Sequence, residues 1–250
     1  MIELTANPGL LQLLLVAGVV VLAAILRAFT GFGFGLAAVP VFSLLMTPQE
    51  AVVLSLSLTF AVSLLTVKTY WGKTPLRPMV SMLLLAVVGT VIGAALLATI
   101  SVQQFRLWIG IAVIVACGVL GYYRPGQHRP GVALGSLAGL GAGVLNGAFA
   151  IPGPPVIVYT MATETDPARS RAFLLTFFLF AAAAGLLTHA AAGFVTGSSL
   201  LHFLLAFPAM YLGDKLGYLL FQRYGTVGYR RVALVLLFVL GVAITAEALW

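Results

Sequence analysis

Charged residues are scarce in this 250-residue chain, and their scarcity excludes a soluble fold. Asp, Glu, Lys and Arg together make up 8% of the sequence, whereas hydrophobic residues make up 62%. A soluble domain carries about 25% charged residues, so this chain lacks the polar groups that would cover a water-exposed surface. Its solvent is therefore expected to be lipid. The length suffices for about eight to ten membrane segments of ~20 residues each.

Cysteine and catalytic motifs are also lacking. Cys117 is the only cysteine, which excludes an intramolecular disulfide and a CxxC redox pair. The chain has no HExxH motif, no paired intramembrane histidines and carboxylates, no Ser/His pair at a meaningful spacing and no P-loop. These absences predict a protein that is not an enzyme, is not driven directly by ATP, and has no cofactor or metal. Nucleic-acid binding has no support beyond the net charge of +7.

Long apolar runs, by contrast, are abundant. Two short runs, 31–46 and 152–162, reach roughly 24 Å and 16 Å at ~1.5 Å per residue, less than the ~30 Å hydrocarbon core. The sequence therefore predicts an all-α polytopic membrane protein with about eight long transmembrane helices and two short broken or re-entrant helices. The runs long enough to span a bilayer are 10–28, 49–71, 78–99, 103–122, 131–147, 167–192, 198–221 and 228–249.

The order of these elements repeats. TPQE at 47–50 predicts a helix start with a Thr47 N-cap and a Glu50 capping box, and TDPARSR at 165–171 predicts one with an Asp166 N-cap. Each follows a short run. VGTVIGAALL at 88–97 also aligns with LGDKLGYLLF at 212–221, glycine on glycine. We expect an N-terminal repeat in 1–122, a linker at 123–130 and a C-terminal repeat in 131–250.

The basic residues predict the topology. We take each short element to return the chain to the side of the membrane from which its preceding long helix came. Of the assigned basic residues, only Arg106 then lies on one side of the membrane, so the other side is expected to be cytoplasmic. Both termini then face away from the cytoplasm in a multi-pass protein of the cell (inner) membrane. Five elements per half make the repeats inverted, as in secondary transporters. The residues on the cytoplasmic side are Arg27, Lys68, Lys73, Arg77, Arg124, Arg129, Arg169, Arg171, Lys215, Arg223, Arg230 and Arg231.

Two glycine- and proline-rich breaks interrupt the apolar runs. They read TGFGFG at 30–35 and GAFAIPGPP at 147–155. A broken helix leaves up to four backbone N–H groups unpaired, which is costly in lipid. A helix N-terminus also carries roughly half a positive charge and binds anions. We therefore expect the half-helices that follow the breaks to converge on one anion near the midplane.

The breaks and glycine pairs together carry a family resemblance. GFGFG followed by Pro40, LGAGVLNGAFAIPGPPVIVY at 140–159, and GxxxG at 89–93 and 213–217 resemble the sulfite exporter TauE/SafE family over nearly the whole length. The resemblance implies transport of sulfite, thiosulfate or an organosulfonate such as sulfoacetate. Alternating Phe and Gly in the first break departs from the denser glycine run common in the family. A passive anion channel of the same architecture is the alternative.

The predicted substrate site follows from both arguments. Arg27 could hold a sulfonate through two parallel hydrogen bonds, or its side chain could extend to the interface. Asn146 and Thr30 could donate to the sulfonate oxygens, although Asn146 could instead only cap a broken helix. Phe32, Phe34 and Phe149 are candidates for a gate or for core packing. The predicted substrate-binding residues are Arg27, Thr30, Gly31, Gly33, Gly35, Asn146, Gly147, Pro152, Gly153 and Pro154.

Few other polar residues lie inside the apolar runs. Asp214 is a candidate for carrying a coupling proton, but pairing with Arg223 or Arg230 is the favoured interpretation. His189 and His202 are expected near the outer ends of adjacent segments, where interfacial histidines are common. The GxxxG pairs are expected to let helices pack closely, either between the repeats or in a homodimer.

Overall fold

The computed structural model describes residues 9–30, 33–122, 132–164, 166–224 and 227–250, and every regular element in these ranges is a helix. Among the described residues, six helices are long and apolar enough to cross a membrane. The chain is therefore a polytopic membrane protein, as predicted. The six helices are α1 (Leu10–Thr30), α3 (Pro48–Leu65), α5 (Arg77–Thr99), α6 (Val102–Tyr122), α9 (Pro167–Ala191) and α11 (Val227–Leu249).

Two of the eight expected spans are not among the six helices that are long and apolar enough to cross a membrane. α7 (Val132–Phe149) counts among the shorter apolar helices over its described side chains. α10 (Gly197–Tyr224) is 28 residues long, but its polar first turn and the charges of Asp214 and Lys215 lower its hydropathy. Both predicted spans are thus helices in the structure, but α7 is short over its described side chains and α10 is less apolar than the other long helices.

The two short helices lie where the breaks predict them. α2 (Gly35–Leu45) and α8 (Gly153–Thr163) have 11 residues each. The helix that follows each of them begins at the predicted cap: Thr47 and Glu50 form a complete capping box, and the Asp166 carboxylate accepts from the Ala168 N–H. A further short helix, α4 (Val67–Tyr70), continues the predicted run 49–71 after an interruption at Thr66.

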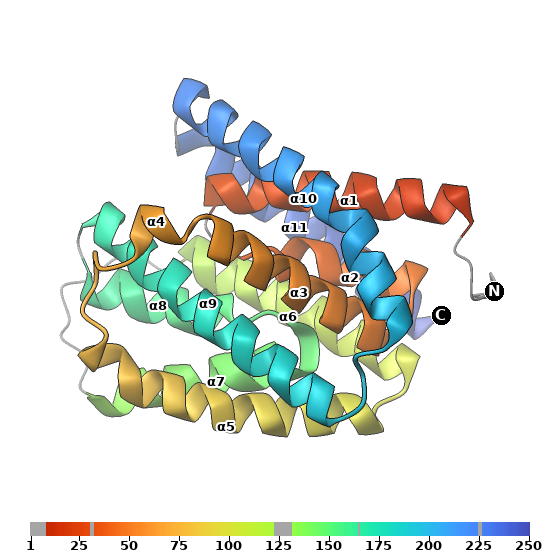
Figure 1. Ribbon diagram of the computed structural model, residues 1–250, viewed down its shortest axis with the longest axis horizontal. Helices are drawn as coiled ribbons and strands as arrows, with labels where there is room; N and C mark the ends of the chain where they lie inside the picture. Colours follow the sequence, from red (N-terminus) through yellow and green to blue (C-terminus); the bar gives the residue numbers. More distant parts are fainter. Residues whose placement is uncertain (1–8, 31–32, 123–131, 165, 225–226) are drawn as a thin grey trace.

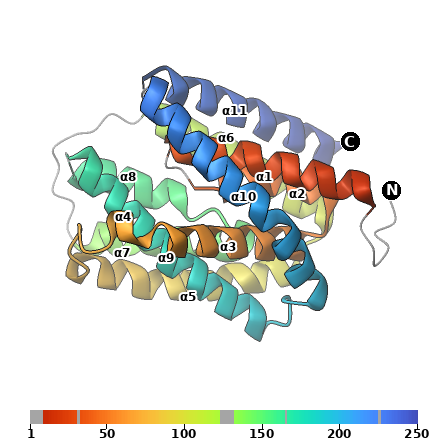
Figure 2. The same cartoon turned by 45° about the horizontal axis from the view of Figure 1, so that its top comes forward.

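Helices from the two halves of the sequence pack side by side. α5 lies along α7, α1 along α10, and α6 along α11 (Figures 1 and 2). Gly89 and Gly93 let α5 approach the α7 backbone, because a Cβ at either would meet backbone atoms of α7. Gly213 and Gly217 do the same for α10 on α1. Both GxxxG pairs therefore pack within the chain, so these glycines are not available for a dimer face.

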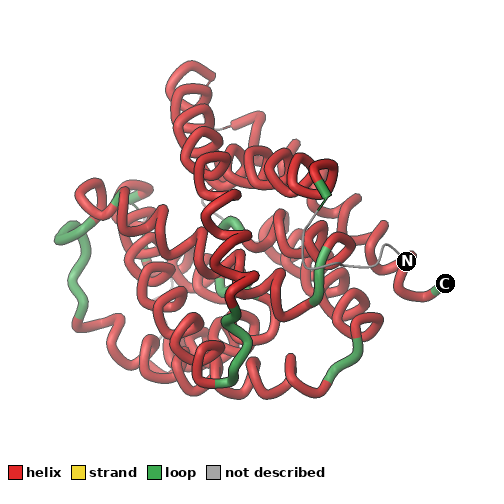
Figure 3. The backbone as a smooth tube through the Cα atoms, turned by 45° about the vertical axis from the view of Figure 1, so that its right-hand side comes forward, coloured by secondary structure: helices red, strands yellow, loops and turns green. Residues whose placement is uncertain are grey.

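The exterior is apolar and the connections lie at the ends of the helices. Leu22 on α1, Leu84 on α5 and Leu187 on α9 are exposed, which suits a surface that faces lipid. The tube in Figure 3 shows long helices joined by short loops at their ends. α1 begins and α11 ends at the same end of the molecule (Figure 1), as an even number of crossings requires. The predicted linker 123–130 lies outside the described residues.

Candidate functional site

The first break separates α1 from α2 over four residues. Gly33 has φ = 93°, a left-handed conformation that favours glycine, and the Phe178 ring of α9 lies over it. Gly35 is the first residue of α2, and a Cβ there would collide with the carbonyl oxygen of Ala150. Gly31 lies outside the described residues, as does the side chain of Thr30, so their predicted roles stay predictions.

The second break meets the first. α7 ends at Phe149 and α8 begins at Gly153, with Ala150 between them at φ = 55°. A non-glycine residue rarely adopts this conformation, and such strain persists only where the surroundings impose it. Because Ala150 lies directly against Gly35, the two breaks touch inside the molecule. The start of α2 therefore lies against the second break, and the convergence of both half-helices on one anion stays a prediction.

A pocket with three basic side chains lies beside the first break. Its volume is about 330 Å³. Arg27 and Tyr70 are buried at its base, whereas Lys73 and Arg171 are exposed at its rim. We call it the cationic pocket, and its lining is completed by Ala28, Thr66, Thr69, Ala168, Ala172, Leu175, Phe178, Asp214 and Tyr218.

One ion pair holds the base of the cationic pocket. Arg27 Nη1 donates to Asp214 Oδ1 over 2.7 Å, with the side chains 7% and 22% exposed. Arg27 is therefore buried and paired inside the protein. Asp214 pairs with Arg27, a partner that the sequence analysis did not assign, and Lys215 instead lies 4.6 Å from the centre of the Tyr211 ring.

The charge balance of the cationic pocket favours an anion. Arg27, Lys73 and Arg171 face a single carboxylate, that of Asp214. The Tyr70 hydroxyl donates to the Ser63 carbonyl over 2.7 Å, and burial raises the pKa of its phenol, so Tyr70 stays neutral near pH 7. Burial strengthens the field of the charges at the base. The pocket can thus hold a small anion against Arg27.

Asn146 lies elsewhere. Its Nδ2 donates to the Ala181 carbonyl over 2.8 Å and to Thr90 Oγ1 over 3.4 Å, and its Oδ1 has no hydrogen-bond partner among the described residues. The carbonyl of the adjacent Gly147 lies 3.0 Å from His189 Nε2. The structure does not bring Asn146 to the cationic pocket, and its role as a ligand stays a prediction.

The proline side of the second break faces an apolar groove. Pro154 lines this groove of about 500 Å³ with Phe149 and Trp108. Gly153 is buried at the start of α8, and Pro152 is the residue before it. Phe34 is buried against Phe42, while Phe149 packs on Phe105, so these rings belong to the core. The predicted site residues are thus divided between the cationic pocket, the touching breaks and this groove.

Several pocket residues were missed by the sequence analysis. The sequence predicts only a topological role for Lys73 and Arg171, and it gives Tyr70 no place in the site. The signal that could have found Arg171 is its place in the first turn and a half of α9, directly after the second short helix. His189 and His202 are buried inside the protein, near the end of α9 and the start of α10.

The comparisons with known proteins support a transporter. The family model described as "Sulfite exporter TauE/SafE" matches residues 16–244, nearly the whole chain. No curated protein and no solved structure gave a significant match. The matched region includes both breaks, both GxxxG pairs and every residue of the cationic pocket. The chain therefore belongs to the sulfite exporter TauE/SafE family of membrane transporters.

Proposed function

We propose that the protein is a secondary transporter that moves a small sulfur-containing anion across the membrane by alternating access. The substrate class is sulfite, thiosulfate or an organosulfonate such as sulfoacetate. The observation that carries the proposal is the cationic pocket, where the buried Arg27 lies beside the first of two helix breaks that touch. Oxyanions suit a guanidinium, which offers parallel hydrogen bonds.

The packing of the halves supports an inverted repeat. α5 of the first half lies on α7, the first helix of the second, and α10 of the second half lies on α1. The aligned glycine motifs place Thr90 where the other half has Asp214. Thr90 contacts Asn146 just as Asp214 contacts Arg27, so the same cross-half contact occurs twice. Such repeats rock against each other in secondary transporters.

The two ends of the molecule differ in a way that suits alternating access. The cationic pocket lies where α3 ends and α9 begins. At the opposite end, Arg106 donates twice to the Ser43 carbonyl near the end of α2, over 2.9 and 3.1 Å, and its Nη1 donates to Glu247 over 2.8 Å. Gln12 Nε2 donates to the Leu45 carbonyl there over 2.8 Å. One end therefore carries the cationic pocket, while side-chain hydrogen bonds tie the helix ends together at the other.

In this mechanism the anion displaces a carboxylate. Asp214 holds Arg27 in the absence of substrate, and an oxyanion that enters between Lys73 and Arg171 competes for the same guanidinium. Binding then loosens the contact between α1 and α10, which belongs to both halves. A ligand shifts a conformational equilibrium by its differential affinity for the two states, and this exchange of partners supplies such a difference.

The test is anion binding by the purified protein, measured as a rise in melting temperature. The panel is sulfite, thiosulfate, sulfoacetate, taurine, sulfate and chloride. A ligand at 100 times its Kd stabilises by about 2.7 kcal/mol, which corresponds to roughly 5–10 °C for a chain of this size. We expect one sulfur oxyanion or sulfonate to give such a shift.

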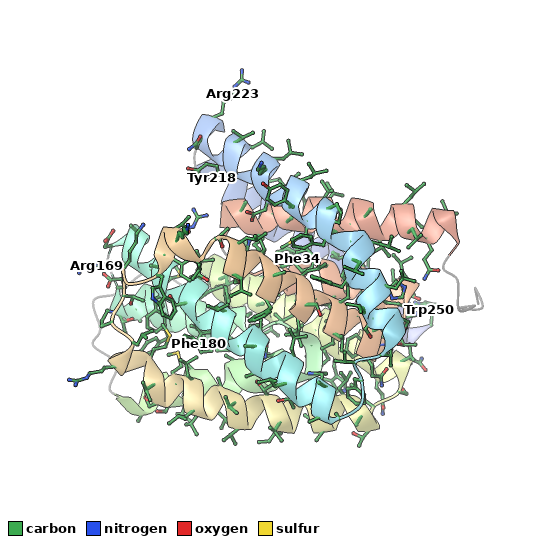
Figure 4. All side chains as sticks on the ribbon, viewed as in Figure 1. Phe34, Arg169, Phe180, Tyr218, Arg223 and Trp250 are labelled. Carbon is green, nitrogen blue, oxygen red and sulfur yellow. The ribbon has the colours of Figure 1, made fainter. Side chains whose placement is uncertain are left out.

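Two neighbouring arginines provide the matched variants. Arg171→Gln removes a pocket cation and should reduce the shift at a given concentration. Arg169→Gln removes a cation that is 68% exposed, lies 3.7 Å from Asp166 and does not line the pocket. Figure 4 shows Arg169 at the outer edge of the bundle. Equal loss of the shift in both variants, or no shift with any anion, would contradict the proposal.

A further inference from the structure

The inverted pairing gives the cationic pocket a counterpart at the other end of the molecule. Arg27 and Ala28 correspond to Asn146 and Gly147, since each pair packs against the equivalent glycine helix of the other half. Counting from the helix-starting prolines Pro48 and Pro167, Tyr70 corresponds to His189. The counterpart therefore consists of Thr90, Asn146, Gly147 and His189, which we call the histidine cluster.

The histidine cluster is closed where the cationic pocket is open. Asn146 and His189 are fully buried. Asn146 Nδ2 contacts Thr90 and the Ala181 carbonyl, and its Oδ1 is buried without a partner among the described residues. His189 ties α9 to the end of α7, because its Nε2 lies 3.0 Å from the Gly147 carbonyl. The cluster has the polar groups of a binding site, and neither Asn146 nor His189 has exposed surface in this conformation.

The contacts of His189 favour an extra proton. Its Nδ1 lies 2.7 Å from the Gly185 carbonyl and its Nε2 lies 3.0 Å from the Gly147 carbonyl. Carbonyl oxygens only accept, and a neutral imidazole has one donor nitrogen. Only the imidazolium donates to both. The Ile151 N–H donates to Leu145 rather than to Gly147, so His189 also provides a donor for a carbonyl at the broken end of α7.

The surroundings both favour and oppose this charge. His189 lies in the last turn of α9, and Gly147 in the last turn of α7, where helix dipoles favour a cation. Burial opposes it, and no described carboxylate forms an ion pair with His189. In the conformation that the structure shows, two carbonyl acceptors and two helix ends thus favour the charge against the burial that opposes it. The charged and titratable groups on α9 and on its packed elements α3, α4, α5 and α8 are Arg169, Arg171, Glu50, Lys68, Tyr70, Arg77 and Tyr159, with none described on α7.

We propose that the histidine cluster is the closed, opposite-face vestibule of the transport pathway and that His189 is its proton-binding residue. The inference rests on the proposed function, because it uses the inverted repeat and the anion. Opening of this face separates α9 from α7 and exposes Asn146 and the His189 imidazolium to the anion. Loss of the proton then removes the charge that holds the anion, which links anion release to proton release.

The first test is made without any anion, so it examines the proton site apart from the proposed function. Melting temperature is measured from about pH 5.5 to about pH 8.5 for the wild type, His189→Gln and His202→Gln. We expect the wild type to lose about 2–4 °C as pH rises, the scale of one lost hydrogen bond. His202→Gln should keep this loss, since His202 is the matched buried histidine of α10, and His189→Gln should lack it.

A second measurement tests the charge of His189 without replacing it, so it does not depend on the folding of His189→Gln. In a chain carrying His128→Gln and His202→Gln, the nitrogen NMR signals of the single remaining imidazole report its charge. Both ring nitrogens should be protonated at the acidic end of the range. A neutral imidazole throughout, or a His189→Gln variant that keeps the wild-type pH profile, would overturn the proposal.

The link to transport is tested in liposomes. Anion flux by the wild type should depend on the pH of the side opposite the cationic pocket, and His189→Gln should lose this dependence. Flux by His189→Gln with unchanged pH dependence would refute the coupling. Normal anion binding by Arg171→Gln would instead contradict the proposed function while leaving the titration of His189 intact, so the two failures are distinguishable.

Discussion

At the scale of single residues, the contact between Arg27 and Asp214 decides how the cationic pocket works. The two groups lie 187 positions apart in the sequence and 2.7 Å apart in the structure. Asp214 is partly exposed and Arg27 is buried. In the proposed mechanism this carboxylate competes with the substrate for the guanidinium, so it lowers anion affinity while it keeps the buried cation satisfied. Removing its charge should therefore help binding, which a purely structural ion pair would not do.

We predict that Asp214→Asn tightens anion binding by about threefold to tenfold, or roughly 0.7–1.4 kcal/mol. The amide still accepts a hydrogen bond from Arg27, but it no longer carries the competing charge. Titration calorimetry with the anion identified in the panel measures the change. Asp166→Asn is the control, because the Asp166 side chain caps α9 and does not line the pocket. Weaker binding by Asp214→Asn would show that the carboxylate organises the site and does not compete.

At the scale of helices, the glycine pairs set the distance between the two halves. A Cβ at Gly93 would meet the Val144 carbonyl and the Ala148 N–H, and one at Gly217 would meet Ala28 and the Ile25 backbone. Backbone atoms cannot move aside as a flexible side chain can, so the helices themselves must separate. These contacts adjoin Arg27 in one half and Asn146 in the other.

We predict that Gly93→Ala and Gly217→Ala each destabilise the protein by roughly 1–3 kcal/mol and slow transport. Gly118→Ala on α6 is the matched control, since nothing lies within 4 Å of the added Cβ, and alanine favours a helix over glycine by about 1 kcal/mol. Melting temperatures and flux in liposomes give both effects. The expectation fails if the two packed glycines tolerate alanine as well as Gly118 does.

Much of this helical framework was predictable from the sequence because helix ends are decided locally. A proline and an N-cap residue mark the starts of α3 and α9, and α3 also has a capping box. The two breaks mark the starts of α2 and α8. The cationic pocket was not predictable, because Arg27 on α1, Arg171 on α9 and the segment that carries Tyr70 and Lys73 are far apart in the sequence and meet only through packing. Basic residues at the ends of membrane helices also set the topology, so the sequence alone could not separate that role from a role in the pocket.

At the scale of the whole molecule, the two ends are chemically unequal although the halves are alike. Arg27 and Asp214 at one end have Asn146 and Thr90 as counterparts at the other. The cationic pocket thus carries the charges of Arg27 and Asp214, whereas the polar side chains of its counterpart are Thr90, Asn146 and His189. In the proposed mechanism an anion is held on one face and released under proton control on the other. A homodimer stays a prediction, as does the orientation of the termini.

Counterflow of sulfite in liposomes tests the central claim most directly. Vesicles containing the protein are loaded with unlabelled sulfite and diluted into a trace of labelled sulfite. A carrier that alternates between two faces exchanges label for internal substrate, so the account predicts a transient accumulation of label above equilibrium. Arg171→Gln should reduce that peak and Arg169→Gln should not. Label that only equilibrates, without rising above the equilibrium level for any anion of the panel, would show a passive channel and contradict the account.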